Sequence, residues 1–376
     1  MADRYPDLLP LFLELCAIPS PPGRERAVAD RVLRYLRDLG LSPDEDGCGP
    51  AIDGDTGNLY VRIPATAAGG TPLVFCAHLD TVLPEGPIEP VVEDGMVRNA
   101  AGTILGADNK AAVVAMLEAT RVVLAEQRPH AGVELVFTPR EETGCDGAKA
   151  FDYGRLAARA GFVYDHAAPV GTIVDAAPFQ RTLDVVYTGR KAHAGIAPED
   201  GRSAILAAAK AIAELRLGRV DHETTANVGT IRGGTARNIV PDRCELVAEC
   251  RSLDEAKAVA LAQEMLDSFT YAGTVCEVDV DVELEEKYPG YRFRHDDPVL
   301  LLGAEALDRI GATPRIESIQ GGADANIFHA HGIRCLVLAN GMAKIHTADE
   351  EIAVDDLGRM TDVTLALIDL ARDRSL

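Results

Sequence analysis

The sequence predicts an α/β protein with two domains, and three observations support this. Strand-like apolar runs alternate with amphipathic helical patterns over residues 1–178 and again over 288–376, which is typical of a mixed, largely parallel sheet flanked by helices. Between these segments, residues 179–287 follow the β-α-β-β-α-β order of a ferredoxin-like α+β domain. At 376 residues the chain is long enough for two cores. The smaller domain is therefore an insertion that interrupts the larger one.

The larger domain begins with two amphipathic helices. The first covers residues 1–18, and a Ser/Pro/Gly turn leads into a second helix that ends at Gly40. Apolar runs then predict strands at 57–65, 71–82, 133–139 and within 161–178, with a helix at 107–127. After the insertion come a helix around 300–311, a strand at 335–340 and a C-terminal helix.

The insertion has its own alternation of strands and helices. Strands are predicted at 181–189, 224–234, 243–253 and 275–288, and helices at 201–218 and 253–273.

Composition and charge exclude several classes of function. The formal net charge is −22 and there is no Lys/Arg-rich block, so we expect neither nucleic acid nor an anionic membrane as a partner. No stretch approaches 18 uninterrupted apolar residues, and the N-terminus lacks the pattern of a signal peptide. The eight cysteines are scattered without a C-x-x-C pair. This argues against thiolate zinc clusters and a disulfide framework, and favours a reducing, cytoplasmic setting.

Ligand-type side chains gather where the predicted strands end. His78 and Asp80 lie two residues apart in the run VFCAHLDTV, so both side chains point to the same face. Asp108 lies where a loop enters a helix, and its carboxylate suits either an N-cap or a ligand. The other candidates are Glu141 and Glu142 after VELVFTP, Asp165 after GFVY, and His346 after CLVLAN.

Each of these residues, taken alone, has an ordinary structural interpretation. A single His after a strand is usually structural, and paired glutamates in a loop are usually just solvated. Two histidines and several carboxylates at the strand ends of one sheet, however, suit a metal site with imidazole and oxygen ligands. We exclude the remaining His166, His329 and His331 as ligands.

The motifs resemble a known family. CAHLDTV, ILGADNKAA, FTPREETGCDGAKAFD and IHTADE are similar, in this order, to the signatures of the M20 metallopeptidases. The run DHAAPVGTIVDAAP is most similar to the peptidase T-like branch. The likeness extends from near Asn58 to His346 and includes the insertion, which the resemblance identifies as a lid and dimerisation domain.

The resemblance implies a role for each candidate. Asp108 would bridge two metal ions, one completed by His78 and Asp165 and the other by Glu142 and His346. Asp80 would orient the imidazole of His78, and Glu141 would be the general base. The residues alone leave open which of the two adjacent glutamates is base and which is ligand. The resemblance also implies a cis Asp108–Asn109 peptide bond. Many relatives have Asp where Asn109 stands, a departure that changes the charge beside the site.

The insertion supplies three further candidates. GRKAHAG resembles the motif in which a His of the lid domain reaches the partner subunit's active site, which assigns that role to His193. Asn238 and Arg251 stand at the spacing at which relatives bind the substrate's carbonyl oxygen and carboxylate. A planar guanidinium suits a carboxylate because it donates two parallel hydrogen bonds. GGADAN, around Gly322 and Asp324, we interpret as structural.

These assignments predict a di-metal amide hydrolase with two divalent ions. We expect both ions to be zinc, and cobalt or manganese to be able to replace it. The branch favours a homodimeric aminopeptidase for short peptides such as tripeptides. The alternatives are an N-acyl amino acid deacylase or a carboxypeptidase with the same residues, and a non-catalytic metal-binding dimer. A serine hydrolase or a dinucleotide-binding dehydrogenase is disfavoured, because neither G-x-S-x-G nor an appropriately placed G-x-G-x-x-G is present.

Overall fold

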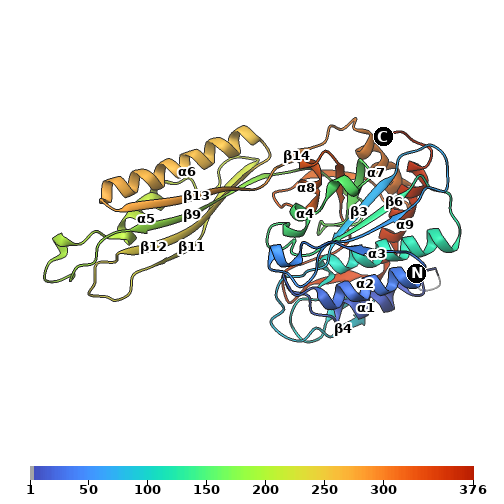
Figure 1. Ribbon diagram of the computed structural model, residues 1–376, viewed down its shortest axis with the longest axis horizontal. Helices are drawn as coiled ribbons and strands as arrows, with labels where there is room; N and C mark the ends of the chain where they lie inside the picture. Colours follow the sequence, from blue (N-terminus) through green and yellow to red (C-terminus); the bar gives the residue numbers. More distant parts are fainter. Residues whose placement is uncertain (1–3) are drawn as a thin grey trace. The chain divides into compact units, whose positions relative to one another are not determined.

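The computed structural model describes residues 4–376, so the first three residues of the predicted first helix lie outside the described residues. The described chain divides into two compact units. The first unit comprises residues up to Asp175, Phe293–Ser318 and Ala323–Leu376, and the inserted unit comprises Ala176–Arg292 and Ile319–Gly322. Figure 1 shows the elements of both units along the chain. The predicted α/β class is confirmed.

The main sheet has a parallel centre with antiparallel strands on both sides. Its order is β1-β2-β6-β3-β7-β16-β8-β14, with β15 also pairing with β8. Strands β6, β3, β7 and β16 are parallel to their neighbours within this group. The bounds are β1 Asp44–Glu45, β2 Leu59–Ile63, β3 Leu73–His78, β6 Val133–Thr138, β7 Ala160–Val163, β8 Thr172–Ala177, β14 Tyr291–Arg292, β15 Arg315–Ser318 and β16 Arg334–Leu338.

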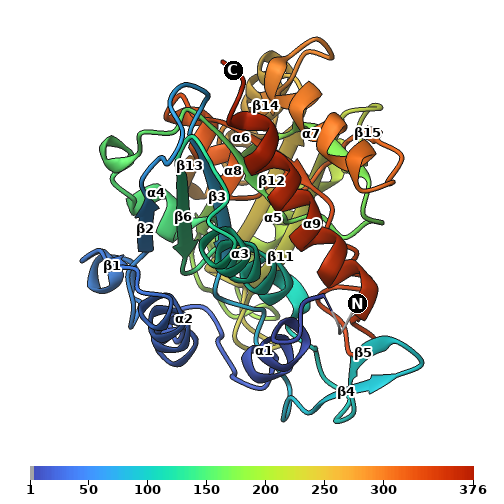
Figure 2. The ribbon, with the colours of Figure 1, turned by 90° about the vertical axis from the view of Figure 1, so that its right-hand side faces the viewer.

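Helices cover both faces of this centre. The bounds are α1 Leu8–Cys16, α2 Arg26–Asp38, α3 Ala107–Ala125, α4 Asp146–Ala150, α7 Pro298–Arg309, α8 Asp324–Ala330 and α9 Val354–Ala371. Phe75 on β3 stacks with Tyr164, whose hydroxyl bonds Thr364 on α9, 2.7 Å away. Its neighbour Cys76 faces Asp324 on α8. Successive strand residues point to opposite faces, so α9 and α8 lie on opposite sides. Figure 2 shows α9 beside α3.

A small second sheet was not predicted. It has the order β17-β5-β4, with β4 Pro90–Glu93, β5 Met96–Asn99 and β17 Glu351–Ala353. Asp94 and Gly95 form the two-residue turn between β4 and β5, both with positive φ. An Asp-Gly pair is a strong hairpin signal, but these short strands carry too few apolar residues to show a periodicity. The sheet ties this hairpin to the chain just after His346.

The inserted unit has the predicted order of elements, with one additional two-residue strand, β10, between α5 and β11. Its sheet runs β10-β11-β12-β9-β13, all antiparallel. Helices α5 and α6 pack on one face, where their alanines meet Leu183, Val185 and Tyr187 of β9 (Figure 1). The bounds are β9 Phe179–Thr188, α5 Ala204–Glu214, β10 Gly218–Arg219, β11 Thr224–Gly233, β12 Arg243–Ser252, α6 Glu255–Cys276 and β13 Asp279–Tyr288. Helix α6 thus extends to Cys276, into the start of the strand predicted at 275–288.

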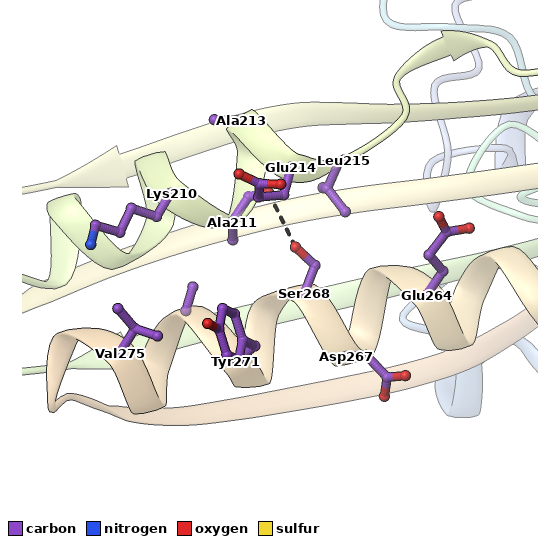
Figure 3. Close-up of a pocket in the computed structure, with 11 residues that line it drawn as sticks. Lys210, Ala211, Ala213, Glu214, Leu215, Glu264, Asp267, Ser268, Tyr271 and Val275 are labelled. Carbon is purple, nitrogen blue, oxygen red and sulfur yellow. Dashed lines mark hydrogen bonds between the residues drawn. The ribbon is translucent and has the colours of Figure 1, made fainter.

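A groove of about 750 Å³ lies between α5 and α6. Figure 3 shows Lys210 and Glu214 of α5 on one side and Asp267 and Tyr271 of α6 on the other. Ser268 joins the two helices by donating a hydrogen bond to the backbone oxygen of Ala211, at 3.3 Å. The lining has no set of metal ligands. Among the described residues, no helix is long and apolar enough to cross a membrane.

Candidate metal centre

Four strand ends of the first unit bring the candidate ligands together. His78 is the last residue of β3, Glu142 follows β6, Asp165 follows β7, and His346 follows β16. Parallel strands end at the same edge of a sheet, where α/β proteins bind their ligands. The sequence positions are far apart, but the sheet topology places all four side chains at one edge.

The ligand-type atoms form two groups that share Asp108. His78, Asp108 and Asp165 make one group, and Asp108, Glu142 and His346 make the other, with atoms within 4.8 Å of one another in each. His78 Nε2 lies 3.3 Å from Oδ1 of Asp108. His346 Nε2 lies 3.3 Å from Oδ2 of the same carboxylate. The two oxygens of Asp108 therefore face different imidazoles, which is the geometry of a bridging carboxylate.

The backbone before α3 presents Asp108. Asp108 and Asn109 have non-helical backbone angles at the start of α3, and the Asp108 carboxylate faces His78 and His346. The Asp108–Asn109 peptide bond is cis, as predicted. Oδ1 of Asp108 is buried and accepts no hydrogen bond. A buried carboxylate oxygen without a donor, facing histidine nitrogens and other carboxylates, fits a divalent cation.

The pKa values show how strongly the carboxylates attract positive charge. Hydrogen bonds to Asp108 and Glu142 raise the pKa of His346 to about 10. Burial would lower the pKa of His78, but the nearby carboxylates of Asp108 and Asp165 raise it well above its ordinary value. Burial raises the pKa of Asp165 to about 7. The carboxylates therefore favour positive charge between them. In this structure protons on the neighbouring side chains supply that charge, and two divalent ions would supply it equally.

Asp80 organises the loop that carries the two glutamates. It is fully buried, and its two carboxylate oxygens accept the backbone N–H groups of Glu141 at 2.9 Å and Glu142 at 3.0 Å. His78 Nδ1 lies 2.9 Å from the backbone oxygen of Asp80 and 3.5 Å from its carboxylate. The His78 imidazole thus contacts the backbone carbonyl of Asp80 more closely than its carboxylate. The Asp80 carboxylate instead fixes the backbone of Glu141 and Glu142.

Glu141 and Glu142 have different surroundings. Glu142 contacts His346 at 3.0 Å between Oε1 and Nε2. Glu141 belongs to neither ligand group, and its Oε1 accepts a weak hydrogen bond from the Cys145 thiol at 3.5 Å. Burial, together with the charge of Asp165, raises the pKa of Glu141 well above its ordinary value. A carboxylate with a raised pKa is suited to accept and return a proton near neutral pH.

Two buried acids support the site and were not foreseen in these roles. Glu350 is 2% exposed, and its carboxylate accepts the backbone N–H groups of Leu105, Gly106 and Asp108 at 2.8–3.0 Å. It therefore fixes the turn that presents Asp108. Asp324 accepts a hydrogen bond from Thr138 at the end of β6. The available signal for Glu350 was its place four residues after His346.

The excluded histidines lie outside both ligand groups. His166 pairs with Glu317, His329 Nε2 contacts the backbone oxygen of Cys335, and His331 Nδ1 contacts that of Ile327.

The inserted unit places its three candidates at two ends of its sheet. His193 and Asn238 are exposed and adjacent, because the His193 segment pairs with Ile239 and Ala194 donates its N–H to the Asn238 oxygen. Both residues lie beyond the start of β12, at Arg243. Arg251 lies near the other end of β12, where it contacts Glu249 and the backbone oxygen of Gln320. Arg251 lies eight residues along the strand from Arg243, about 26 Å at roughly 3.3 Å per residue.

Comparisons with known proteins agree with this architecture. Residues 181–272 match the family model described as a peptidase dimerisation domain. The uncharacterized protein YqjE of Bacillus subtilis strain 168 is 38% identical over 97% of this chain and 98% of its own length. The aminopeptidase PepT of Bacillus cereus ATCC 10987 is 39% identical, with a TM-score of 0.89 and 98% of each chain covered.

Two further solved structures are similar. A tripeptidase of Staphylococcus aureus subsp. aureus Mu50 is 35% identical, with a TM-score of 0.93, covering 98% of this chain and 99% of that chain. The YXEP protein of Bacillus subtilis, described as a dinuclear metal-binding peptidase, is 16% identical, with a TM-score of 0.74 and 99% of each chain covered. At that identity the likeness shows the fold alone.

Proposed function

Because the chain belongs to the M20 family of metallopeptidases, in its peptidase T-like branch, we propose that it removes the amino-terminal residue from short peptides, tripeptides above all. The observation that carries the proposal is the pair of ligand groups sharing Asp108. The aminopeptidase and tripeptidase named among the similar structures point to the substrate class.

We propose the following roles in the first unit. His78 and Asp165 would hold one divalent ion, Glu142 and His346 the other, and Asp108 both. Two such ions lower the pKa of a water molecule and polarise a carbonyl group. Zinc suits this set of nitrogen and oxygen donors, and cobalt or manganese would substitute.

Proton transfer falls to Glu141 in this proposal. It lies beside the ligand groups without belonging to them, and burial raises its pKa. It would take the proton from the attacking water and deliver it to the leaving amine. Asp80, through the two N–H groups that it accepts, keeps Glu141 and Glu142 on their respective sides.

The inserted unit supports a site completed by two copies of the chain. An extended tripeptide spans at most about 11 Å. Within one inserted unit, Arg251 lies about 26 Å along β12 from Arg243, and the His193–Asn238 pair lies beyond that end of the strand. One short substrate therefore cannot contact all three residues of a single chain. We propose that Arg251 of one copy binds the substrate carboxylate, while His193 and Asn238 reach it from the second copy.

The edge of β11 beyond the two residues paired with β10 is the better candidate for the interface between copies. On β13, the other edge, five acidic residues would face those of a second copy: Asp279, Asp281, Glu283, Glu285 and Glu286. On β11, Ile231 is 50% exposed and lies on the helix face, opposite the buried Leu246. Leu206 on α5 adds exposed apolar surface. Like charges across paired strands are destabilising, so we assign a homodimer interface to β11 and α5.

The setting we propose is the cytoplasm, since all eight cysteines are free and six of them are buried.

Hydrolysis of a small substrate panel tests the function. Metal-stripped protein is assayed with Ala-Ala-Ala, Ala-Ala, N-acetyl-ornithine and an N-acyl glutamate, with and without added zinc or cobalt. We expect metal-restored cleavage of the tripeptide. Cleavage of an acyl amino acid alone would instead assign a deacylase, and binding of two ions without any cleavage would contradict the proposed activity.

A further inference from the structure

A pocket of about 340 Å³ opens beside His346 in the first unit. Its walls come from the loop after β3, through Val82, Leu83 and Glu85, and from the segment before α3, through Thr103 and Ile104. The volume is at the lower end of the roughly 300–1,000 Å³ of small-molecule sites. Because His346 contacts Asp108 and Glu142, the pocket adjoins one of the two ligand groups.

Hydrogen bonds fix both walls relative to one another. The Thr103 hydroxyl accepts the backbone N–H of Glu85 at 2.9 Å. Asn99, at the end of β5, donates to the backbone oxygens of Pro87, Thr103 and Ile104 and accepts the N–H of Glu89. The Asn99 side chain, on the hairpin of the small sheet, thus anchors both the loop after β3 and the segment before α3. Such a pocket is preformed, which reduces the entropy lost on binding.

The lining combines apolar side chains with one carboxylate. Leu83 is 72% exposed, although a leucine gains free energy by leaving water, and Val82 and Ile104 continue the apolar surface. The lining contains Glu85 and no Lys or Arg. Its one imidazole, that of His346, faces the carboxylates of Asp108 and Glu142. Among the described residues, the Glu85 carboxylate has no ion pair or hydrogen bond with a side chain. The pocket therefore attracts a cation attached to an apolar group and repels a carboxylate.

We propose that this pocket receives the side chain of the substrate's amino-terminal residue and that Glu85 pairs with its α-ammonium group. The proposal rests on the aminopeptidase function above and adds its specificity. A tripeptide has one positive end and one negative end, and only the positive end suits Glu85. The pocket then selects a free amino terminus with an apolar first residue, such as leucine, over glycine.

Leu83→Ser tests the apolar part. The ratio of kcat/KM for Leu-Gly-Gly to that for Gly-Gly-Gly is measured in the wild type and the variant. We expect the ratio to fall on the order of ten-fold, since losing a hydrophobic contact in a pocket changes discrimination by about 10- to 200-fold and Leu83 is one of three contacts. Leu301→Ser is the matched control, because Leu301 is 50% exposed on α7, outside the pocket lining. An unchanged ratio for Leu83→Ser would overturn the assignment.

Glu85→Gln tests the ammonium contact. KM for Leu-Gly-Gly should rise about 3- to 10-fold with kcat nearly unchanged, the size expected for a solvent-accessible ion pair. The probe 4-methylpentanoyl-glycyl-glycine has the same side chain and no ammonium, so its inhibition constant should be the same for variant and wild type. Glu89→Gln, an exposed glutamate on the same loop outside the pocket lining, should leave both values unchanged.

The outcomes separate this inference from the function on which it rests. If the wild type hydrolyses neither tripeptide, the aminopeptidase function fails. If it hydrolyses them and Glu85→Gln weakens the desamino probe as much as Leu-Gly-Gly, the carboxylate acts only on pocket structure and the inference fails alone.

Discussion

Glu141 and Glu142 are neighbours in sequence, but the structure gives them different partners. Oε1 of Glu142 lies 3.0 Å from Nε2 of His346, whereas Oε1 of Glu141 accepts a weak hydrogen bond from the Cys145 thiol. These different partners suit the proposed roles, in which Glu142 holds an ion and Glu141 moves a proton. This separation cannot be read from two adjacent identical letters.

The two glutamates should therefore fail in different ways. Glu141→Gln should lower kcat at least about 100- to 10,000-fold, the usual range for a general base, with metal content unchanged. Glu142→Ala should lower the bound metal, because one ligand group loses an oxygen. Plasma emission analysis of the purified variants, together with tripeptide hydrolysis, distinguishes the two. Substantial turnover by Glu141→Gln would show that another group takes the proton.

Glu350 should affect metal binding indirectly, because it fixes the turn that presents Asp108. Its carboxylate accepts three backbone N–H groups around the turn at 105–108, and Glu350→Gln would turn an amide N–H₂ toward donors. We expect a loss of about 1–3 kcal/mol in the free energy of unfolding, the cost of leaving buried groups unsatisfied, and weaker metal retention. Urea unfolding and metal analysis measure both.

The exposed Asp349 supplies a control for this change. Asp349→Asn alters one charge on the same segment without touching the turn, and should stay within about 0.5 kcal/mol of the wild type. Equal effects of both variants would mean that the general charge of the segment, and not the three N–H contacts, stabilises the turn.

At the scale of elements, the parallel strands were predictable because each is a short apolar run that ends in a ligand residue, as β3 does, or precedes one. The run at 71–82 contains β3, and the run at 133–139 contains β6. The small sheet was missed because β4, β5 and β17 have three or four residues each and little apolar periodicity. The N–H contacts of Asp80 and Glu350 were also missed, since they join segments about 60 and 245 residues apart.

Strand β7 depends on a glycine at its centre. Gly161 pairs with Val74 of β3 and Cys335 of β16, and a Cβ there would lie 2.4 Å from the Val74 oxygen. Gly161→Ala should therefore cost about 1–3 kcal/mol or more, as overpacked cores do, and displace Asp165 four residues later. Urea unfolding and metal retention check this. Gly47→Ala, which would meet no atom within 4 Å, should be nearly neutral, and a neutral Gly161→Ala would contradict the packing argument.

For the whole molecule, the choice between the two sheet edges of the inserted unit can be tested by a matched pair of substitutions. Ile231→Glu places a charge on β11, and Leu284→Glu places the same charge on the already acidic β13, where the leucine is 39% exposed. Burying an unpaired carboxylate at an interface is costly, so sedimentation should show a monomer for Ile231→Glu and a dimer for Leu284→Glu. The reverse result would move the interface to β13.

A site shared by two copies makes a stronger prediction about activity. His193→Ala and Arg251→Ala should each be nearly inactive alone, because each removes one residue from both sites of the dimer. If the residues come from different copies, a mixed dimer has one site with both residues intact and one with neither. Random mixing makes half of the dimers mixed, so activity should recover to about a quarter of the wild type in a two-fold symmetric assembly.

The control for this mixing experiment is the monomeric variant. Adding Ile231→Glu to both chains should prevent the recovery while circular dichroism shows that they remain folded. If both residues came from the same chain, every site in a mixed dimer would lack one of them. No recovery would then occur, and the distance between Arg251 and the His193–Asn238 pair would have to be closed by rearrangement within one inserted unit.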